Sequence, residues 1–305
     1  MPITCWHCAT ELPDHAKYCL ECGRSVRQIG RTHVFAIANQ EGKVGKTTTA
    51  VNLAAYLADA GRETLLIDLS PNARATASLG IDPHRLGNSM YKVLVTNSVA
   101  AADAIKVDIT PQTGSNPNLS LLPAKVDLYA ADFEWADLED REYRLKRALE
   151  PIQDRYDYIL IDCPSWLGFL TLNALVAADG VILPLQCEYV ALEGMQELIK
   201  TIKLVKDRHL NPRIELFGVV LTMFDARTKL ANEVVQEIKD HFDREKFETI
   251  IPHNVRLSEA PSFGLTILQH DPRSPGALAY KALAEEVIAR GEAEVTSAPK
   301  APGRR

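Results

Sequence analysis

Residues 39–48 decide the fold class, and they read Asn39-Gln40-Glu41-Gly42-Lys43-Val44-Gly45-Lys46-Thr47-Thr48. An apolar run, HVFAIA, precedes them at 33–38, and TAVNLAAYLADAG follows at 49–61 with its apolar residues at helical spacing. A strand, a glycine-containing loop that ends in Lys-Thr and a helix are the context of a phosphate-binding loop (P-loop). Gln40 departs from the strict G-x4-G-K-[ST] pattern, which has glycine at that position.

The chemistry of a P-loop comes from its backbone and from two side chains. Its N–H groups and the following helix N-terminus would bind the phosphates of a nucleotide. Lys46 would reach the β- and γ-phosphate oxygens, and the Thr47 hydroxyl would hold Mg2+. The alternative for Lys46 and Thr47 is an ordinary helix start, and the strands described next remove most of the support for it.

Two later apolar runs end in an aspartate. YDYILIDC at 156–163 contains Asp162, and ETLLIDL at 63–69 contains Asp68. A strand that ends in an acid beside a P-loop is the Walker B arrangement, in which Asp162 would bind Mg2+ through water. Because parallel strands present their carboxyl ends at one edge of a sheet, these strand ends would face the same ligand.

From His33 onward, strand-length apolar runs alternate with helical stretches. This pattern predicts an α/β fold, with a mostly parallel sheet flanked by helices. The clearest helix spans about 191–207, with Met195 in its core-facing stripe. The runs are 33–39, 63–69, 119–123, 156–163, 180–185, 214–222 and 248–252.

Four of the six cysteines crowd into the N-terminal segment, as two Cys-x2-Cys pairs. Such pairs suit one tetrahedral Zn2+ site, and a segment of about 26 residues needs the metal to fold because it cannot build a hydrophobic core. Two disulfides are the alternative, which a reducing compartment disfavours. The predicted zinc ligands are Cys5, Cys8, Cys19 and Cys22.

Composition and charge limit the class of protein. Thirty-four Lys and Arg residues against forty Asp and Glu residues give a net charge of −6, so nucleic-acid binding would need a local basic patch. No uncharged stretch reaches the roughly 18 apolar residues of a membrane span, and MPITCWHC is no secretory signal. We therefore expect a soluble cytoplasmic protein, with a zinc ribbon at 1–26, a linker at 27–32, a P-loop domain at 33–292 and a disordered tail at 293–305.

Six motifs together resemble ParA/Soj-type partition ATPases, of the deviant Walker A P-loop family within the ParA/MinD superfamily. They are NQEGKVGKTTTAVNLAAYLADAG, LLIDLSPNARATASLG, YDYILIDCPSWLGFLTLNAL, PLQCEYVALEGM, LTMFDARTKLANEVV and IPHNVRLSEAPSFG. The resemblance covers about 33–290. It implies a protein that binds ATP and Mg2+, forms an ATP-sandwiched dimer, coats DNA non-specifically and releases DNA when a ParB-like partner stimulates hydrolysis.

The resemblance also assigns residues. Arg227 and Arg256 match basic positions tied to DNA binding, and Lys229 is a candidate phosphate contact beside them. Asp162 matches the Walker B acid, and Asp68 matches an acid that serves the magnesium shell. The nucleotide-binding set is Gly42, Lys43, Val44, Gly45, Lys46, Thr47 and Thr48, with Lys46 and Asp68 as catalytic residues.

Two departures from the family pattern affect hydrolysis. Glu41 stands where a signature lysine reaches across the dimer, which reverses a charge near the triphosphate. Ser70 stands where LLIDLDPQGN has the acid that orients the attacking water, and a serine hydroxyl is no such base. Lys43, at a position usually filled by glycine, either restores positive charge near the phosphates or pairs with Glu41 in solvent.

The sequence therefore predicts a ParA/Soj-like protein that binds ATP, Mg2+, Zn2+ and non-specific DNA, positions DNA or another cargo on the nucleoid, and hydrolyses ATP slowly or not at all. Its partners would be a ParB-like or other adaptor and a second ParA-like chain, in a homodimer or heterodimer. The alternative is a non-enzymatic scaffold that pairs with an intact ParA-like protein and recruits partners through its ribbon. A MinD-like membrane role is disfavoured, because no amphipathic basic helix follows Arg290.

The cysteine spacing generates the first testable prediction. Elemental analysis of protein purified under reducing conditions, without chelators, should find about one zinc per chain. Replacing Cys5 with serine should lower that content and unfold the ribbon, whereas the same change at Cys187, far from the pairs, should leave the zinc content unchanged. Metal-free protein would contradict the prediction.

Overall fold

The structure is a computed structural model that describes residues 3–5, 10–13, 19, 21, 32–107, 118–188 and 191–297. An eight-stranded sheet forms its body, in the order β10-β9-β8-β3-β7-β4-β6-β5, and only β5 runs antiparallel to its neighbour. The strands are β3 (His33–Ile37), β4 (Thr64–Asp68), β5 (Lys106–Val107), β6 (Leu119–Leu122), β7 (Tyr158–Asp162), β8 (Gly180–Gln186), β9 (Glu215–Phe224) and β10 (Lys246–Pro252).

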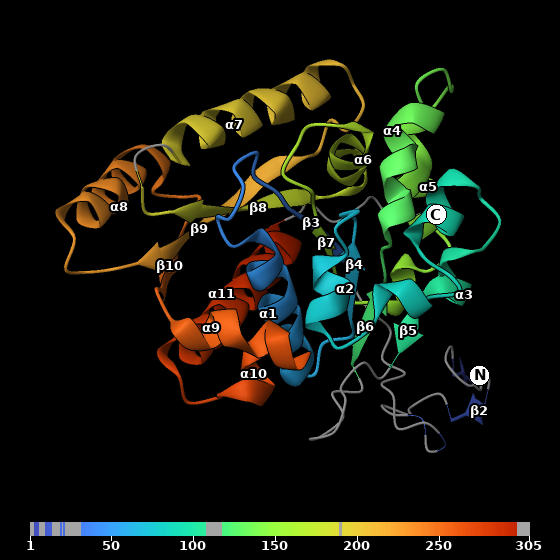
Figure 1. The fold of residues 1–305 in the computed structure, drawn as a ribbon, viewed down its shortest axis with the longest axis horizontal. Helices are drawn as coiled ribbons and strands as arrows, with labels where there is room; N and C mark the ends of the chain where they lie inside the picture. The colour runs from blue at the N-terminus through green and yellow to red at the C-terminus, as the bar shows by residue number, and fades with distance from the viewer. Residues whose placement is uncertain are drawn as a thin grey trace.

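Helices cover both faces of this sheet (Figure 1). One layer contains α1 (Lys46–Asp59), α2 (Arg74–Ser78), α9 (Val255–Glu259), α10 (Ile267–His270) and α11 (Pro275–Ser297). The other contains α3 (Ala101–Ala104), α4 (Ala131–Glu134), α5 (Arg144–Leu149), α6 (Phe169–Ala177), α7 (Ala191–Asp207) and α8 (Lys229–Phe242). Short 3-10 or π turns are η1 (Pro83–Arg85), η2 (Tyr91–Val95), η3 (Val126–Ala130), η4 (Arg141–Tyr143), η5 (Gln153–Arg155) and η6 (Ala260–Phe263).

The period of two along each central strand builds two separate cores. On β3, Val34 and Ala36 pack under the layer that contains α3 to α8, whereas Phe35 and Ile37 pack under α1 and α11. Strands buried on both faces read as continuous apolar runs, which is why β3 and β7 are apolar at nearly every position. Their carboxyl ends therefore emerge from a rigid, fully buried platform.

The α/β fold with a mostly parallel sheet is confirmed. All seven strand-length runs are strands of the parallel part, and α7 has the bounds expected from its periodicity, with Met195 buried. The tail boundary needs a correction, because α11 continues to Ser297 and residues 293–297 are helical rather than disordered. Glu292, Ala293 and Glu294 are good helix formers, which favours continuing α11 past Arg290. None of the helices in the described ranges combines the length and apolarity that a membrane crossing requires.

The N-terminal module is described only in part. Strand β1 (Ile3–Thr4) pairs antiparallel with β2 (Glu11–Leu12), and the Cys5 N–H donates to the Thr10 carbonyl at 2.8 Å. Cys5 and Cys19 are both buried. Cys8, Cys22 and most of the linker lie outside the described residues, so the four-cysteine site stays a prediction.

Candidate nucleotide-binding site

The P-loop lies between β3 and α1, and its backbone explains where glycine is preferred. Gly45 has φ 89° and Lys43 has φ 64°, both in the left-handed region. The loop is held from β9, where the Thr222 hydroxyl donates to the Val44 carbonyl at 2.9 Å. Lys43 is exposed and, among the described residues, forms no ion pair with Glu41 or any other acid. The expected alternative of a Lys43–Glu41 pair is therefore not seen.

Lys46 is the buried cation of the site. Its Nζ donates to the Glu41 carbonyl oxygen at 2.5 Å, so the ammonium closes on the loop that precedes it. Burial lowers the pKa of Lys46, and the carboxylate of Asp162 opposes that effect. An anion within the loop would offer the same ammonium a second acceptor.

Two carboxylates stand side by side at the ends of β4 and β7. The parallel register pairs Asp68 with Asp162, and both are fully buried. Burial raises the pKa of each, and the charge of Asp68 raises that of Asp162 further. Two adjacent buried carboxylates are costly to ionise together, so a cation at this edge would relieve a repulsion built into the sheet.

Only one of the two carboxylates has an oxygen to spare. Asp68 accepts hydrogen bonds from Ser70 N, Thr76 N and the Thr76 hydroxyl, at 3.1, 2.8 and 2.7 Å. Asp162 Oδ2 accepts from the Thr47 hydroxyl at 2.8 Å, but its buried Oδ1 has no partner. A hydroxyl, a carboxylate oxygen and a nearby Lys46 fit Mg2+ with nucleotide phosphates. Thr47 and Asp162 would hold the metal, and Asp68 would instead fix the chain after β4.

Sequence reasoning missed a cavity of about 90 Å³ beside Gly45 and Thr48. Its wall comes from the ends of β9 and β10 and includes Met223, Pro252 and His253. Met223 has φ 53°, an uncommon conformation for a residue with a side chain and one that recurs at ligand sites. The motifs LTMFD and IPHN each contain the end of a strand, β9 or β10, at the P-loop edge, and that shared edge was the available signal. The place and lining would suit a nucleobase.

The comparisons with known proteins agree with this geometry. A family model described as an AAA domain matches residues 32–216, and a zinc-ribbon domain matches 4–26. The sporulation initiation inhibitor protein Soj of Bacillus subtilis is 49% identical over 258 residues, which are 85% of this chain and 99% of that protein. The chain belongs to the ParA/Soj family of partition ATPases.

Other relatives extend this result. The chromosome partitioning protein ParA of Myxococcus xanthus is 44% identical over 302 residues, 98% of this chain and 99% of that protein. Its match therefore includes the ribbon segment, beyond the 33–290 range. A cobyrinic acid a,c-diamide synthase from Mycobacterium smegmatis, solved with bound ADP and magnesium, superposes with a TM-score of 0.74 at 34% identity, covering 89% of this chain and 100% of that one.

The two positions that depart from the ParA/Soj pattern are both part of the P-loop edge. The half-buried Glu41 side chain packs on the first turn of α7, because a Cβ on Gly194 would lie 2.6 Å from Glu41 Cγ. Ser70 is buried, its N–H donates to Asp68, and its carbonyl accepts from Ala73 N at 2.8 Å. Glu41 thus faces its own chain, and Ser70 serves the turn that starts α2.

The three predicted DNA-binding cations are all paired with carboxylates. Arg227 binds Asp225 at 2.7 Å, Lys229 binds Glu233 at 3.1 Å, and Arg256 binds Glu259 at 2.8 Å. The side-chain hydrogen bond from Arg227 lowers the pKa of Asp225 to about 2. These cations are exposed enough to reach a phosphate, but each would first have to leave a carboxylate.

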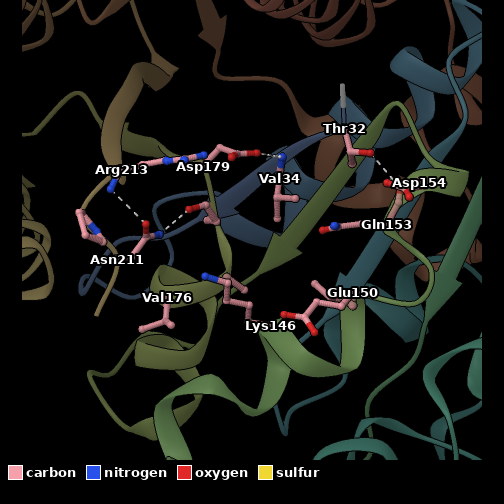
Figure 2. A pocket seen from close by; sticks show the side chains of 14 residues that line it. Thr32, Val34, Lys146, Glu150, Gln153, Asp154, Val176, Asp179, Asn211 and Arg213 are labelled. Carbon is pink, nitrogen blue, oxygen red and sulfur yellow. Dashed lines mark hydrogen bonds between the residues drawn. The ribbon is translucent and has the colours of Figure 1, made fainter. Parts of the chain in front are cut away.

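A wider cavity of about 670 Å³ opens at the opposite edge of the sheet, beside Val34 on β3 and Asp179 just before β8 (Figure 2). Its wall carries mixed charges, with Lys146 and Arg213 among carboxylates such as Glu150. None of the described site residues predicted from the sequence lines this cavity, so it is separate from the P-loop.

The carboxylate pair predicts how Asp162→Asn behaves. The raised pKa of Asp162 means that the folded protein holds this proton more tightly than the unfolded chain does. Above the pKa of the unfolded chain, about 4, ionisation of Asp162 therefore destabilises the folded protein, and the loss grows as the pH rises. Without nucleotide at pH 8, the variant should melt at least about 2 °C higher than the wild type, and less so at pH 5. Asp59→Asn, at an exposed position, should leave the melting temperature unchanged at both pH values.

With Mg2+ and a non-hydrolysable ATP analogue, the order should reverse. The wild type should gain thermal stability because a ligand that binds only the folded state stabilises it. Asp162→Asn should gain little, since the metal loses its carboxylate. Equal stabilisation of both proteins by the analogue would remove Asp162 from the magnesium site.

Proposed function

We propose that this ParA/Soj-family protein binds ATP with Mg2+ at the P-loop and uses the bound nucleotide to partition DNA or another cargo. The observation that carries the proposal is the convergence of Lys46, Thr47 and the unpartnered Asp162 Oδ1 at one sheet edge. The names of the relatives, chromosome partitioning proteins and ATPases, support the cellular role. The nucleoid in the cytoplasm would be the place of action.

The same edge argues for slow hydrolysis. Phosphoryl transfer depends on positioning and on neutralising the charge of the transition state. Glu41 brings an anion, turned onto α7, where a cation would have to reach across a dimer. Ser70 brings a short hydroxyl where a carboxylate would orient the attacking water. Losing such a group typically costs on the order of 100-fold or more in rate.

The partners follow from this assignment. Nucleotide binding would drive dimerisation with a second ParA-like chain, identical or different. A ParB-like or other adaptor protein would bind the dimer. The zinc-ribbon match at 4–26 supports a Zn2+ module that adds a protein contact, because residues 1–31 carry no clear excess of positive charge.

A second candidate is a non-enzymatic scaffold that pairs with an intact ParA-like protein. The pairing of Arg227, Lys229 and Arg256 with carboxylates favours it, since a phosphate backbone gains less from cations that are already neutralised. On this alternative the protein binds nucleotide, turns over none and has little affinity for DNA by itself.

Steady-state ATP hydrolysis, measured with DNA present, tests separately the replacement of the signature lysine by Glu41 and of the water-orienting acid by Ser70. Wild type, Glu41→Lys, Ser70→Asp and the double variant should all bind ATP, and the wild type and both single variants should have negligible turnover. The double variant should exceed the product of the single effects, because groups that act together in a transition state are non-additive. Lys46→Ala in the double background is the matched negative control.

Robust wild-type turnover, equal to that of an intact ParA-like ATPase assayed alongside, would contradict slow hydrolysis. Loss of nucleotide binding in the wild type would contradict the site itself. The two results are independent, because binding is measured by calorimetry with the non-hydrolysable analogue.

DNA binding is the remaining component. We expect retention on DNA that falls steeply with salt and does not depend on sequence, since cations that contact phosphates displace counterions. Arg227→Glu with Arg256→Glu should abolish it without unfolding the protein. Arg85→Glu is the control, because Arg85 is an exposed, ion-paired arginine elsewhere on the surface. Unchanged binding by the double variant would place the DNA contact outside these residues and make the ribbon the next candidate.

A further inference from the structure

Helix α2 begins at Arg74, directly after the turn that follows β4. Ala73 has φ 50°, which turns the chain into the helix, and Thr76 in its first turn binds Asp68 through both its N–H and its hydroxyl. The start of α2 is therefore fixed to the carboxylate at the end of β4.

This anchoring places Arg74 at the phosphate edge of the sheet. Asp68 is aligned with Asp162 across the β4–β7 pair, and Asp162 binds Thr47 at the start of α1. Burial dominates the pKa of both Asp162 and Lys46, but the positive charge of Arg74 lowers each of them. Through Thr76 and Asp68, the start of α2 is therefore fixed at the same edge of the sheet as Asp162 and Thr47, which would hold Mg2+.

Arg74 also differs from the arginines around it. Its side chain is exposed and, among the described residues, makes no hydrogen bond, ion pair or ring contact. Arg85, on the turn after α2, is bound to Asp82, and Arg256 is bound to Glu259. An uncompensated guanidinium beside a site for a polyanion is a suitable phosphate ligand, because its planar fork donates two parallel hydrogen bonds.

The local charges point to the outer end of the nucleotide. Lys46 is held deep in the loop, and Glu41 adds a negative charge to the loop. Arg74 directly follows the turn in which the Ala73 N–H donates to the Ser70 carbonyl, so α2 begins beside the position where the ParA/Soj pattern has its water-orienting acid.

We propose that Arg74 binds the γ-phosphate of ATP held in the P-loop of the same chain and supplies, from within the chain, the positive charge that Glu41 lacks. This inference rests on the proposed ATP site. It gives the protein a way to hold ATP more tightly than ADP without the water-orienting carboxylate that hydrolysis needs, so that the ATP-bound form is long-lived.

The test is titration calorimetry of the full chain with Mg2+ and either ADP or a non-hydrolysable ATP analogue. Arg74→Ala should weaken the binding of the ATP analogue by about 10- to 100-fold, which is the range expected for loss of a charged hydrogen bond. The affinity for ADP should be unchanged. Arg74→Lys should give an intermediate loss. Arg85→Ala, a matched exposed arginine, should change neither nucleotide, and all variants should melt like the wild type without ligand.

The possible failures can be told apart. Equal loss of both nucleotides in Arg74→Ala, or no loss of either, would overturn the γ-phosphate contact while leaving the ATP site intact. A wild type that binds neither nucleotide would overturn the proposed function and this inference with it.

Discussion

The parallel register between β4 and β7 sets Asp68 beside Asp162 in a fully buried setting, and the rest of the site is arranged around that repulsion. The Thr47 hydroxyl and Lys46 approach from α1, while Thr76 engages Asp68 from α2. Donors to carboxylates in a low-dielectric interior stabilise the charged forms, yet one oxygen of Asp162 stays without a partner. A divalent cation would neutralise both carboxylates and give this oxygen a partner.

The side chains around this pair differ from the ParA/Soj pattern at two positions, Glu41 and Ser70. Glu41 packs on α7 within its own chain, and the Ser70 N–H donates to Asp68 in the turn that precedes α2. Helix α2, which begins at the exposed Arg74, is fixed to the same edge through Thr76 and Asp68. Binding energy for a triphosphate and catalysis of its hydrolysis depend on different groups, so a site can keep the first and lose most of the second. Such a protein would stay in its ATP-bound form for a long time instead of being switched rapidly by hydrolysis.

Much of this could be predicted from sequence because the signals are local. Buried parallel strands produce continuous apolar runs, and the 191–207 helix shows its buried stripe directly. Strand β5 was missed because two residues carry no periodicity, and the cavity near Met223 was missed because β9 and β10 build it from separate motifs. Asp225 lies two residues before Arg227 in the sequence, but a sequence alone does not show whether two neighbouring charged side chains form an ion pair. The tail boundary was placed too early because the polarity of the segment was taken as a sign of disorder, whereas Ala293 and Glu294 favour the continuation of α11.

The most direct measurement is a crystal structure of the full chain with Mg2+ and a non-hydrolysable ATP analogue. We expect the metal on the Thr47 hydroxyl, next to Asp162, and the Lys46 ammonium turned from the Glu41 carbonyl onto the phosphate oxygens. The base should lie against Met223 and Pro252. Nucleotide bound elsewhere, or bound here with Lys46 still on Glu41 and no metal near Asp162, would contradict the magnesium–nucleotide site on which the proposed function depends.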